Sequence, residues 1–142
     1  MKKLVLFVVL VCLSAVAMSQ PYYSKAAGDL DQLATWGDQP DGSGTSPGNF
    51  TTAGVTYIIT NRATATLGAA WAVSGVGSKV QVGDGVTTVD FTVPATFAFT
   101  GTVDVTSTGT LTLNNTTIPT FGTLDAASKV VFSAGAAQSI PG

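Results

Sequence analysis

The feature that most constrains this chain is a series of short runs in which apolar and polar residues alternate. Such alternation puts every second side chain on one face of an extended backbone, so each run predicts one half-buried strand. The runs are Val80–Val82, Val89–Val93, Phe97–Phe99, Val103–Val105 and Leu111–Leu113. Glycine, asparagine and other turn residues separate them, which is typical of short strands joined by tight turns. The chain is therefore predicted to be all-β.

The runs themselves recur at a longer interval. Gly101–Val105 (GTVDV) has a counterpart 21 positions later in Gly122–Ala126 (GTLDA), and Val93-Pro94 returns as Ile118-Pro119 and Ile140-Pro141. A period of about 20 to 25 residues with three short strands fits one coil of a parallel β-solenoid, and the usual hand of parallel crossovers predicts a right-handed β-helix. A β-sandwich is the alternative fold, but it predicts no such repeat.

The two ends of the predicted stack pose different problems. Residues 55–142 have room for about four coils, and a terminal coil exposes apolar surface and unpaired backbone unless something covers it. The chain ends in Ile140-Pro141-Gly142, which looks like the opening of another repeat. We therefore expect the sequence to be the N-terminal part of a longer polypeptide, or an oligomeric partner to cover the last coil.

Residues 20–54 differ from the repeats and are expected to form an N-terminal cap with a turn-rich lead-in. The segment Ser24–Trp36 places Leu30 and Leu33 at helical spacing, with Asp29 before them as an N-cap and a glycine after them as a stop. This pattern predicts a short amphipathic helix that covers the first coil.

Residues 1–19 have the layout of a secretory signal peptide. Two lysines precede an apolar run from Leu4 to Leu13, and small residues follow. Cleavage is expected after Ser19, with Ala17 as the alternative site. The apolar run is short for a membrane helix, and no later segment approaches the roughly 20 apolar residues that a span needs. We expect the mature chain to be secreted or at the cell surface, with no membrane span.

The expected mature chain lacks much of the usual catalytic repertoire. The one cysteine belongs to the leader, there is no histidine, and all eight acids are aspartates. Histidine is the commonest general base, and cysteine is a common nucleophile and soft ligand. The expected mature chain has four basic residues against the eight aspartates, so its net charge is about −4. The four bases are scattered along the sequence and form no cluster that could bind phosphate: Lys25, Arg62, Lys79 and Lys129. We expect neither an enzyme nor a partner of nucleic acid.

Asp38–Gly44 (DQPDGSG) has the acid and glycine content of a calcium loop, and calcium is the one cofactor that the sequence raises. Asp38 and Asp41 are the candidate metal ligands. An EF-hand-like loop needs a bidentate acid at its end, normally glutamate, which this chain lacks. Pro-Asp-Gly is a turn signal in its own right, so a turn is the favoured interpretation. Gly83-Asp84-Gly85 is likewise interpreted first as a turn and only second as a ligand site.

Trp36 and Trp71 are candidate ligand residues, because aromatic faces stack on sugar rings. Tryptophans at an apolar seam are more often part of a core or cap, and the alternation in Trp71-Ala72-Val73 predicts an inward side chain. The threonines suggest a second candidate binding surface, a flat Thr-x-Thr array that binds ice or crystalline polysaccharide. Thr110-Leu111-Thr112 does not recur in the next coil, where the chain reads Ser128–Phe132 (SKVVF), so this array is not expected.

Four stretches together cover essentially the whole expected mature chain: Tyr22–Gly37, Asp41–Gly54, Ala69–Gly85 and Phe91–Gly142. They resemble the start of large secreted surface proteins of the Bacteroidetes, which are long, repetitive and adhesin-like and often carry a type IX sorting signal. The resemblance implies a structural role at the cell surface, with surface polysaccharide or other surface proteins as partners. The alternative is a carbohydrate-binding or accessory module of a larger polysaccharide-active extracellular protein.

Overall fold

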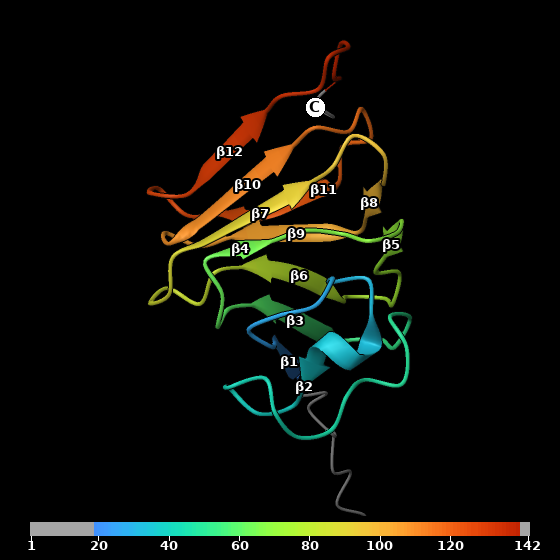
Figure 1. Cartoon of the computed structure of the whole chain (residues 1–142), viewed down its shortest axis with the longest axis vertical. Helices are drawn as coiled ribbons and strands as arrows, with labels where there is room; N and C mark the ends of the chain where they lie inside the picture. Colours follow the sequence, from blue (N-terminus) through green and yellow to red (C-terminus); the bar gives the residue numbers. More distant parts are fainter. Residues whose placement is uncertain (1–18, 140–142) are drawn as a thin grey trace, which may run out of the picture.

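The computed structural model describes residues 19–139, which form a stack of short strands (Figure 1). The expected signal peptide up to residue 18 and the final Ile140-Pro141-Gly142 lie outside the described residues. The strands are β1 (Gln20–Ser24), β2 (Trp36–Gly37), β3 (Val55–Ile59), β4 (Thr64–Ala65), β5 (Trp71–Ala72), β6 (Lys79–Val82), β7 (Val89–Val93), β8 (Phe99–Thr100), β9 (Thr102–Val105), β10 (Gly109–Leu113), β11 (Thr120–Leu124) and β12 (Lys129–Phe132).

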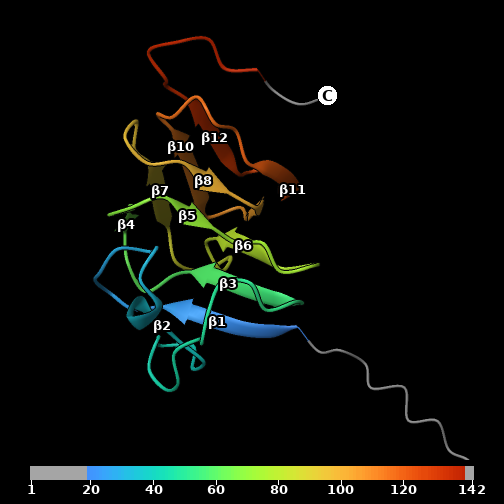
Figure 2. The ribbon, with the colours of Figure 1, turned by 90° about the vertical axis from the view of Figure 1, so that its right-hand side faces the viewer.

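The strands form three sheets that run along one stack. Sheet A has the order β11-β9-β6-β3-β1-β2, sheet B the order β12-β10-β7-β4, and sheet C consists of β5 and β8, which lie side by side in Figure 2. Every pairing is parallel except that of β1 with β2. The predicted parallel β-solenoid is therefore confirmed, and the β-sandwich, which needs antiparallel sheets, is excluded.

The solenoid makes about three turns, against the four that the sequence length allowed. β3, β6 and β9 each begin a turn, and β11 with β12 forms part of a further one; only the turns that begin at β3 and β6 have a strand in sheet C. Equivalent residues are 23 positions apart between β3 and β6 and again between β6 and β9. From β9 to β11 the step is 18 residues at Thr102–Thr120 and 19 at Val105–Leu124. The 21-residue spacing between Gly101–Val105 and Gly122–Ala126 is therefore not the spacing of paired residues in the structure. Alternation determines which face of the sheet a residue occupies, but it does not determine which residue of the next strand pairs with it.

The register changes at a β-bulge that accommodates a carboxylate. Between Phe121 and Leu124 the pairing of β11 with β9 shifts. Asp104 of β9 lies beside this point, where its Oδ1 accepts a hydrogen bond of 2.7 Å from the backbone N–H of Thr123. A Cβ atom on Gly122 would overlap the same oxygen. Glycine is needed here because the carboxylate occupies the space of a side chain.

Inward side chains of successive coils stack into one apolar core. Phe91 of β7 lies in register with Leu111 of β10, and Val80 of β6 lies in register with Val103 of β9. All four are 0% exposed. Full burial of a side chain of this size contributes about 1.5 to 3 kcal/mol, so the stacked rows are the main source of stability.

The α-helix predicted within Ser24–Trp36 is wrong. The segment begins at the end of β1, and only Leu33–Thr35 forms a single 3-10 turn before β2. Asp29 does not cap this turn, since Gln32 occupies the cap position. Leu30 is nevertheless fully buried, as its spacing had indicated.

Arg62 explains why this segment does not need to be helical. In a helix, backbone oxygens accept bonds from the next turn. Here Arg62 donates instead, through Nε to Lys25 O at 2.7 Å, through Nη1 to Gly28 O at 2.6 Å and through Nη2 to Ala27 O at 2.9 Å. Because these partners lie more than 30 positions from Arg62 in the sequence, local spacing could not reveal the arrangement.

Candidate functional site

The candidate calcium loop closes on its own backbone. Asp38 Oδ1 accepts a hydrogen bond of 3.0 Å from Thr45 N–H, and Asp41 Oδ1 accepts one of 2.9 Å from Ser43 N–H. The backbone N–H of Gly42 donates to Gln39 O at 2.8 Å, which tightens the turn. Each carboxylate therefore has a partner in the loop or at the residue directly after it, as the turn interpretation predicts.

Hydrogen bonds also favour the charged form of Asp41. Hydrogen bonds from Ser43, first from its side chain and then from its backbone, hold the pKa of Asp41 below its ordinary value. Within residues 19–139 no three acidic, histidine or cysteine side chains are grouped so as to hold a metal ion. Calcium at Asp38 and Asp41 stays a prediction, with two anionic side chains as its basis.

Both tryptophans lie inside the molecule. Trp36 is 0% and Trp71 2% exposed, and their rings stack on each other with centroids 5.7 Å apart. Tyr57 packs edge-on against Trp36 at 5.3 Å, and Phe99 lies 5.1 Å from Trp71. The indole faces are covered by other aromatic rings, so in this structure the pair belongs to the core and offers no open platform for a sugar ring.

The Gly83-Asp84-Gly85 segment follows β6 and leads to β7, from sheet A to sheet B within one coil. Asp84 Oδ1 accepts bonds from the N–H groups of Val86 at 2.8 Å and Thr87 at 2.6 Å, and Oδ2 accepts one from the Thr60 hydroxyl at 2.8 Å. Burial acts to raise the pKa of Asp84, but these bonds outweigh it and lower the pKa. The carboxylate stabilises a bend and ties it to the preceding coil.

An ion pair on sheet A escaped the sequence analysis. Lys79 Nζ lies 2.5 Å from Asp104 Oδ2, across the parallel pairing of β6 and β9. Asp104 is only 7% exposed, and its other carboxylate oxygen accepts the hydrogen bond from Thr123 N–H described above. The two residues are 25 positions apart, and only knowledge of the strand register brings them together.

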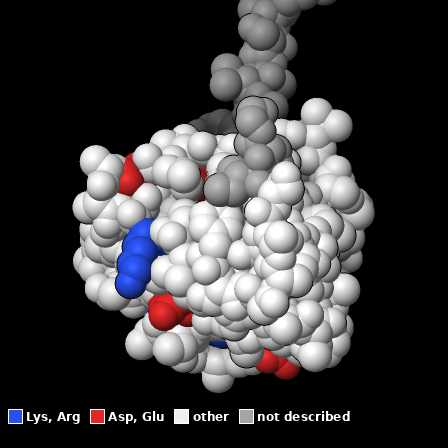
Figure 3. Space-filling model, turned by 90° about the horizontal axis from the view of Figure 1, so that it is seen from above, with Lys and Arg blue, Asp and Glu red and all other residues white. Residues whose placement is uncertain are grey.

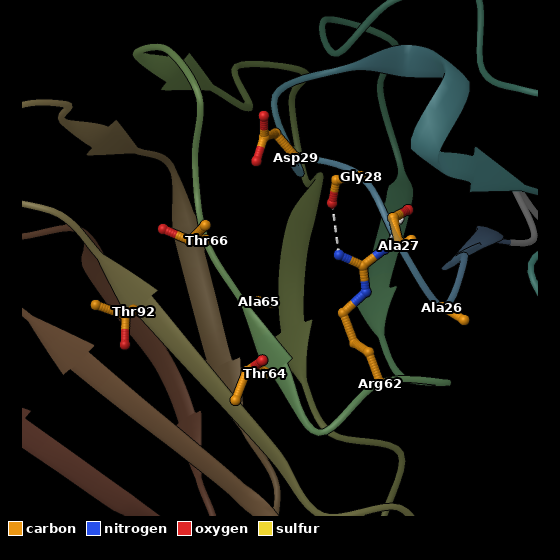
Figure 4. A pocket seen from close by; sticks show the side chains of 9 residues that line it. All are labelled: Ala26, Ala27, Gly28, Asp29, Arg62, Thr64, Ala65, Thr66 and Thr92. Carbon is orange, nitrogen blue, oxygen red and sulfur yellow. Dashed lines mark hydrogen bonds between the residues drawn. The ribbon is translucent and has the colours of Figure 1, made fainter.

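An open depression of about 340 Å³ lies between β4 and the segment that replaces the predicted helix (Figure 4). It is lined by Ala26, Ala27, Gly28, Asp29, Arg62, Thr64, Ala65, Thr66 and Thr92. Burial lowers the pKa of Arg62, and the charge of Asp29 partly offsets this effect. Because the guanidinium is engaged by backbone oxygens, the threonine hydroxyls and Asp29 are the groups left to meet a solute.

The outer side of sheet B carries part of the threonine array. Thr92 of β7 pairs in register with Thr112 of β10, while Thr110 pairs with Asp90. In the next coil the equivalents of Thr110 and Thr112 are a lysine and a valine, at positions 129 and 131. The array is interrupted where the sequence predicted, although Thr92 lengthens it by one coil in the other direction.

The chain shows no match to a protein-family model, a curated protein or a solved structure. None of the helical residues in the described part forms a helix long and apolar enough to cross a membrane. The parallel strand pairings place the chain in a structural class, the parallel β-solenoid.

Proposed function

We propose that this chain is a segment of a secreted or cell-surface, adhesin-like structural β-repeat protein and has no catalytic activity of its own. The observation that carries the proposal is the uninterrupted stack of coils from β3 to β12, in which apolar residues fill the interior. The carboxylates of Asp31, Asp38, Asp41, Asp84 and Asp104 all accept hydrogen bonds from the chain itself. These carboxylates support the proposal because their hydrogen bonds stabilise the fold.

The architecture suits a spacer or stalk. Each coil contacts only its neighbours, so a solenoid grows along one axis without a change in cross-section. Every further coil adds about 4.8 Å of length, which is the spacing between paired strands. A long, thin scaffold of this kind can hold a binding region away from a cell surface.

Export and surface exposure are tested in the cells that produce the protein. An antibody against the folded chain should label intact cells. The control is an antibody against a cytosolic protein, which should label the cells only after they are permeabilised. Mass spectrometry of the exported protein should find Gln20 at its N-terminus, or Met18 for the alternative cleavage. Labelling that requires permeabilisation would refute the surface role.

The second candidate is a carbohydrate-binding or accessory module of a larger extracellular protein. The threonine-lined depression beside β4 favours it, because hydroxyl groups and Asp29 can exchange hydrogen bonds with a sugar. Sedimentation with insoluble polysaccharides tests it. Retention that is lost on Thr64→Val with Thr66→Val, and kept on Thr116→Val at an exposed position outside the depression, would favour this candidate.

A further inference from the structure

The C-terminal end of the stack presents the inward rows of its last coil to solvent. Leu124 is 45% and Phe132 40% exposed, whereas their register partners one coil below, Val105 and Leu113, are at most 1% exposed. The four side chains that continue the buried rows are Phe121, Leu124, Val130 and Phe132. Viewed from this end, the surface is mostly uncharged (Figure 3). The apolar core is therefore open at this end.

The backbone is open at the same place. Within residues 19–139, β11 is the last strand of sheet A and β12 the last strand of sheet B, so each pairs on one side only. At the opposite end β2 pairs antiparallel with β1, and the 3-10 turn with Trp36 completes the cover. In the part of the chain that the structure describes, one end of the solenoid is thus capped, and the edge strands at the other end leave N–H and C=O groups unpaired beside apolar side chains.

The direction of the chain after β12 follows the coil beneath it. Ser133 N–H donates to Leu113 O at 2.9 Å, and the Gln138 amide donates to Asn115 O at 2.8 Å. In the coil below, the corresponding segment leads from β10 to β11. Residues 133–139 therefore carry the backbone back towards the open edge of sheet A.

We infer that the open end takes one further parallel solenoid coil, in register with β11 and β12, whose inward residues cover these four side chains, of which Leu124 and Phe132 are exposed. This inference rests on the proposed function, in which the solenoid serves as a stalk. A second copy of the chain is a less suitable occupant, because a two-fold axis would pair the edge strands antiparallel. All pairings between coils from β3 to β12 are parallel.

The test supplies such a coil, followed by a second copy of the end coil, from the chain's own sequence. The described structure begins at Ser19, so residues 19–139 are produced alone and with a second copy of residues 102–139 attached after Ser139. Thr102 of the copy then follows Thr120 by 20 positions, within the observed steps of 18 to 23. We expect one cooperative thermal transition with a midpoint at least about 5 °C higher, since each added coil contributes an interface.

A matched control removes the cover without changing the length. In the control extension, the copies of Val103, Val105, Leu111 and Leu113 are replaced by serine. The intact extension should melt above the control, and equal midpoints or a separate transition for the added segment would overturn the inference. This result does not depend on cell location, so failure of the surface role in the labelling experiment is distinguishable from failure here.

Sedimentation of the unextended chain tests the second copy as occupant. We expect a monomer. A dimer that Leu124→Lys with Phe132→Lys abolishes, but Val76→Lys leaves intact, would overturn the parallel coil in favour of a second copy. Val76 is the appropriate control because it is 86% exposed and lies outside the open rows.

Discussion

The two stacked tryptophans should respond unequally to the same substitution. Both are buried, but Trp36 Nε1 donates to Leu30 O at 2.9 Å, whereas Trp71 Nε1 has no hydrogen-bond partner within the described structure. Replacing either residue with phenylalanine removes the same part of the indole ring and the same N–H group. The volume terms are therefore similar, and the hydrogen bond is the main difference between the two variants.

The sign and size of the difference follow from that bond. Trp36→Phe leaves the buried Leu30 O without its donor, which costs about 1 to 3 kcal/mol beyond the lost volume. Trp71→Phe removes an unpaired donor whose burial opposes folding by about 1 to 3 kcal/mol. We therefore expect the free energy of unfolding to fall further in Trp36→Phe, by about 2 to 6 kcal/mol relative to Trp71→Phe.

Urea unfolding of residues 19–142, followed by circular dichroism, measures this difference. The two variants should have the same dependence of free energy on urea and different midpoints, with Trp36→Phe lower. Equal midpoints, or a lower midpoint for Trp71→Phe, would refute the assignment of the hydrogen bond as the distinguishing feature.

Three further changes probe the polar contacts. Arg62→Ala should cost about 2 to 4 kcal/mol, because three backbone oxygens lose their donor, and Arg62→Lys should recover less than half of this in urea unfolding since it lacks the forked geometry. Burial, which raises the pKa of Asp84, is outweighed by hydrogen bonds that lower it. The resulting stability is present above the unfolded pKa of about 4 and is lost as pH falls through the folded value, so Asp84→Asn should flatten the acid side of a melting-temperature profile. EDTA should leave the melting temperature unchanged if bonds within the loop suffice; a decrease that Asp38→Asn and Asp41→Asn remove would instead establish calcium there.

Much of the fold was predictable because alternation is a local property. Five runs of alternating residues indicated strands, and β7 has the predicted bounds, Val89–Val93. At Phe97–Phe99 only the last residue belongs to a strand, β8. The inward direction of Trp71 followed from the same alternation, and its burial agrees with it. The candidate calcium loop closes as the Pro-Asp-Gly turn signal indicated.

The sequence by itself determined which side chains face inward and that the strands repeat, because a period of two and the spacing of turns are encoded along a few neighbouring residues. Tertiary structure alone decided the register, the depression beside β4 and the bulge at Gly122. It also replaced the expected helix with a loop braced by Arg62. Those features depend on groups far apart in the chain, whose contacts form when one coil lies on another, and no local pattern specifies which carbonyl or carboxylate a distant donor will meet.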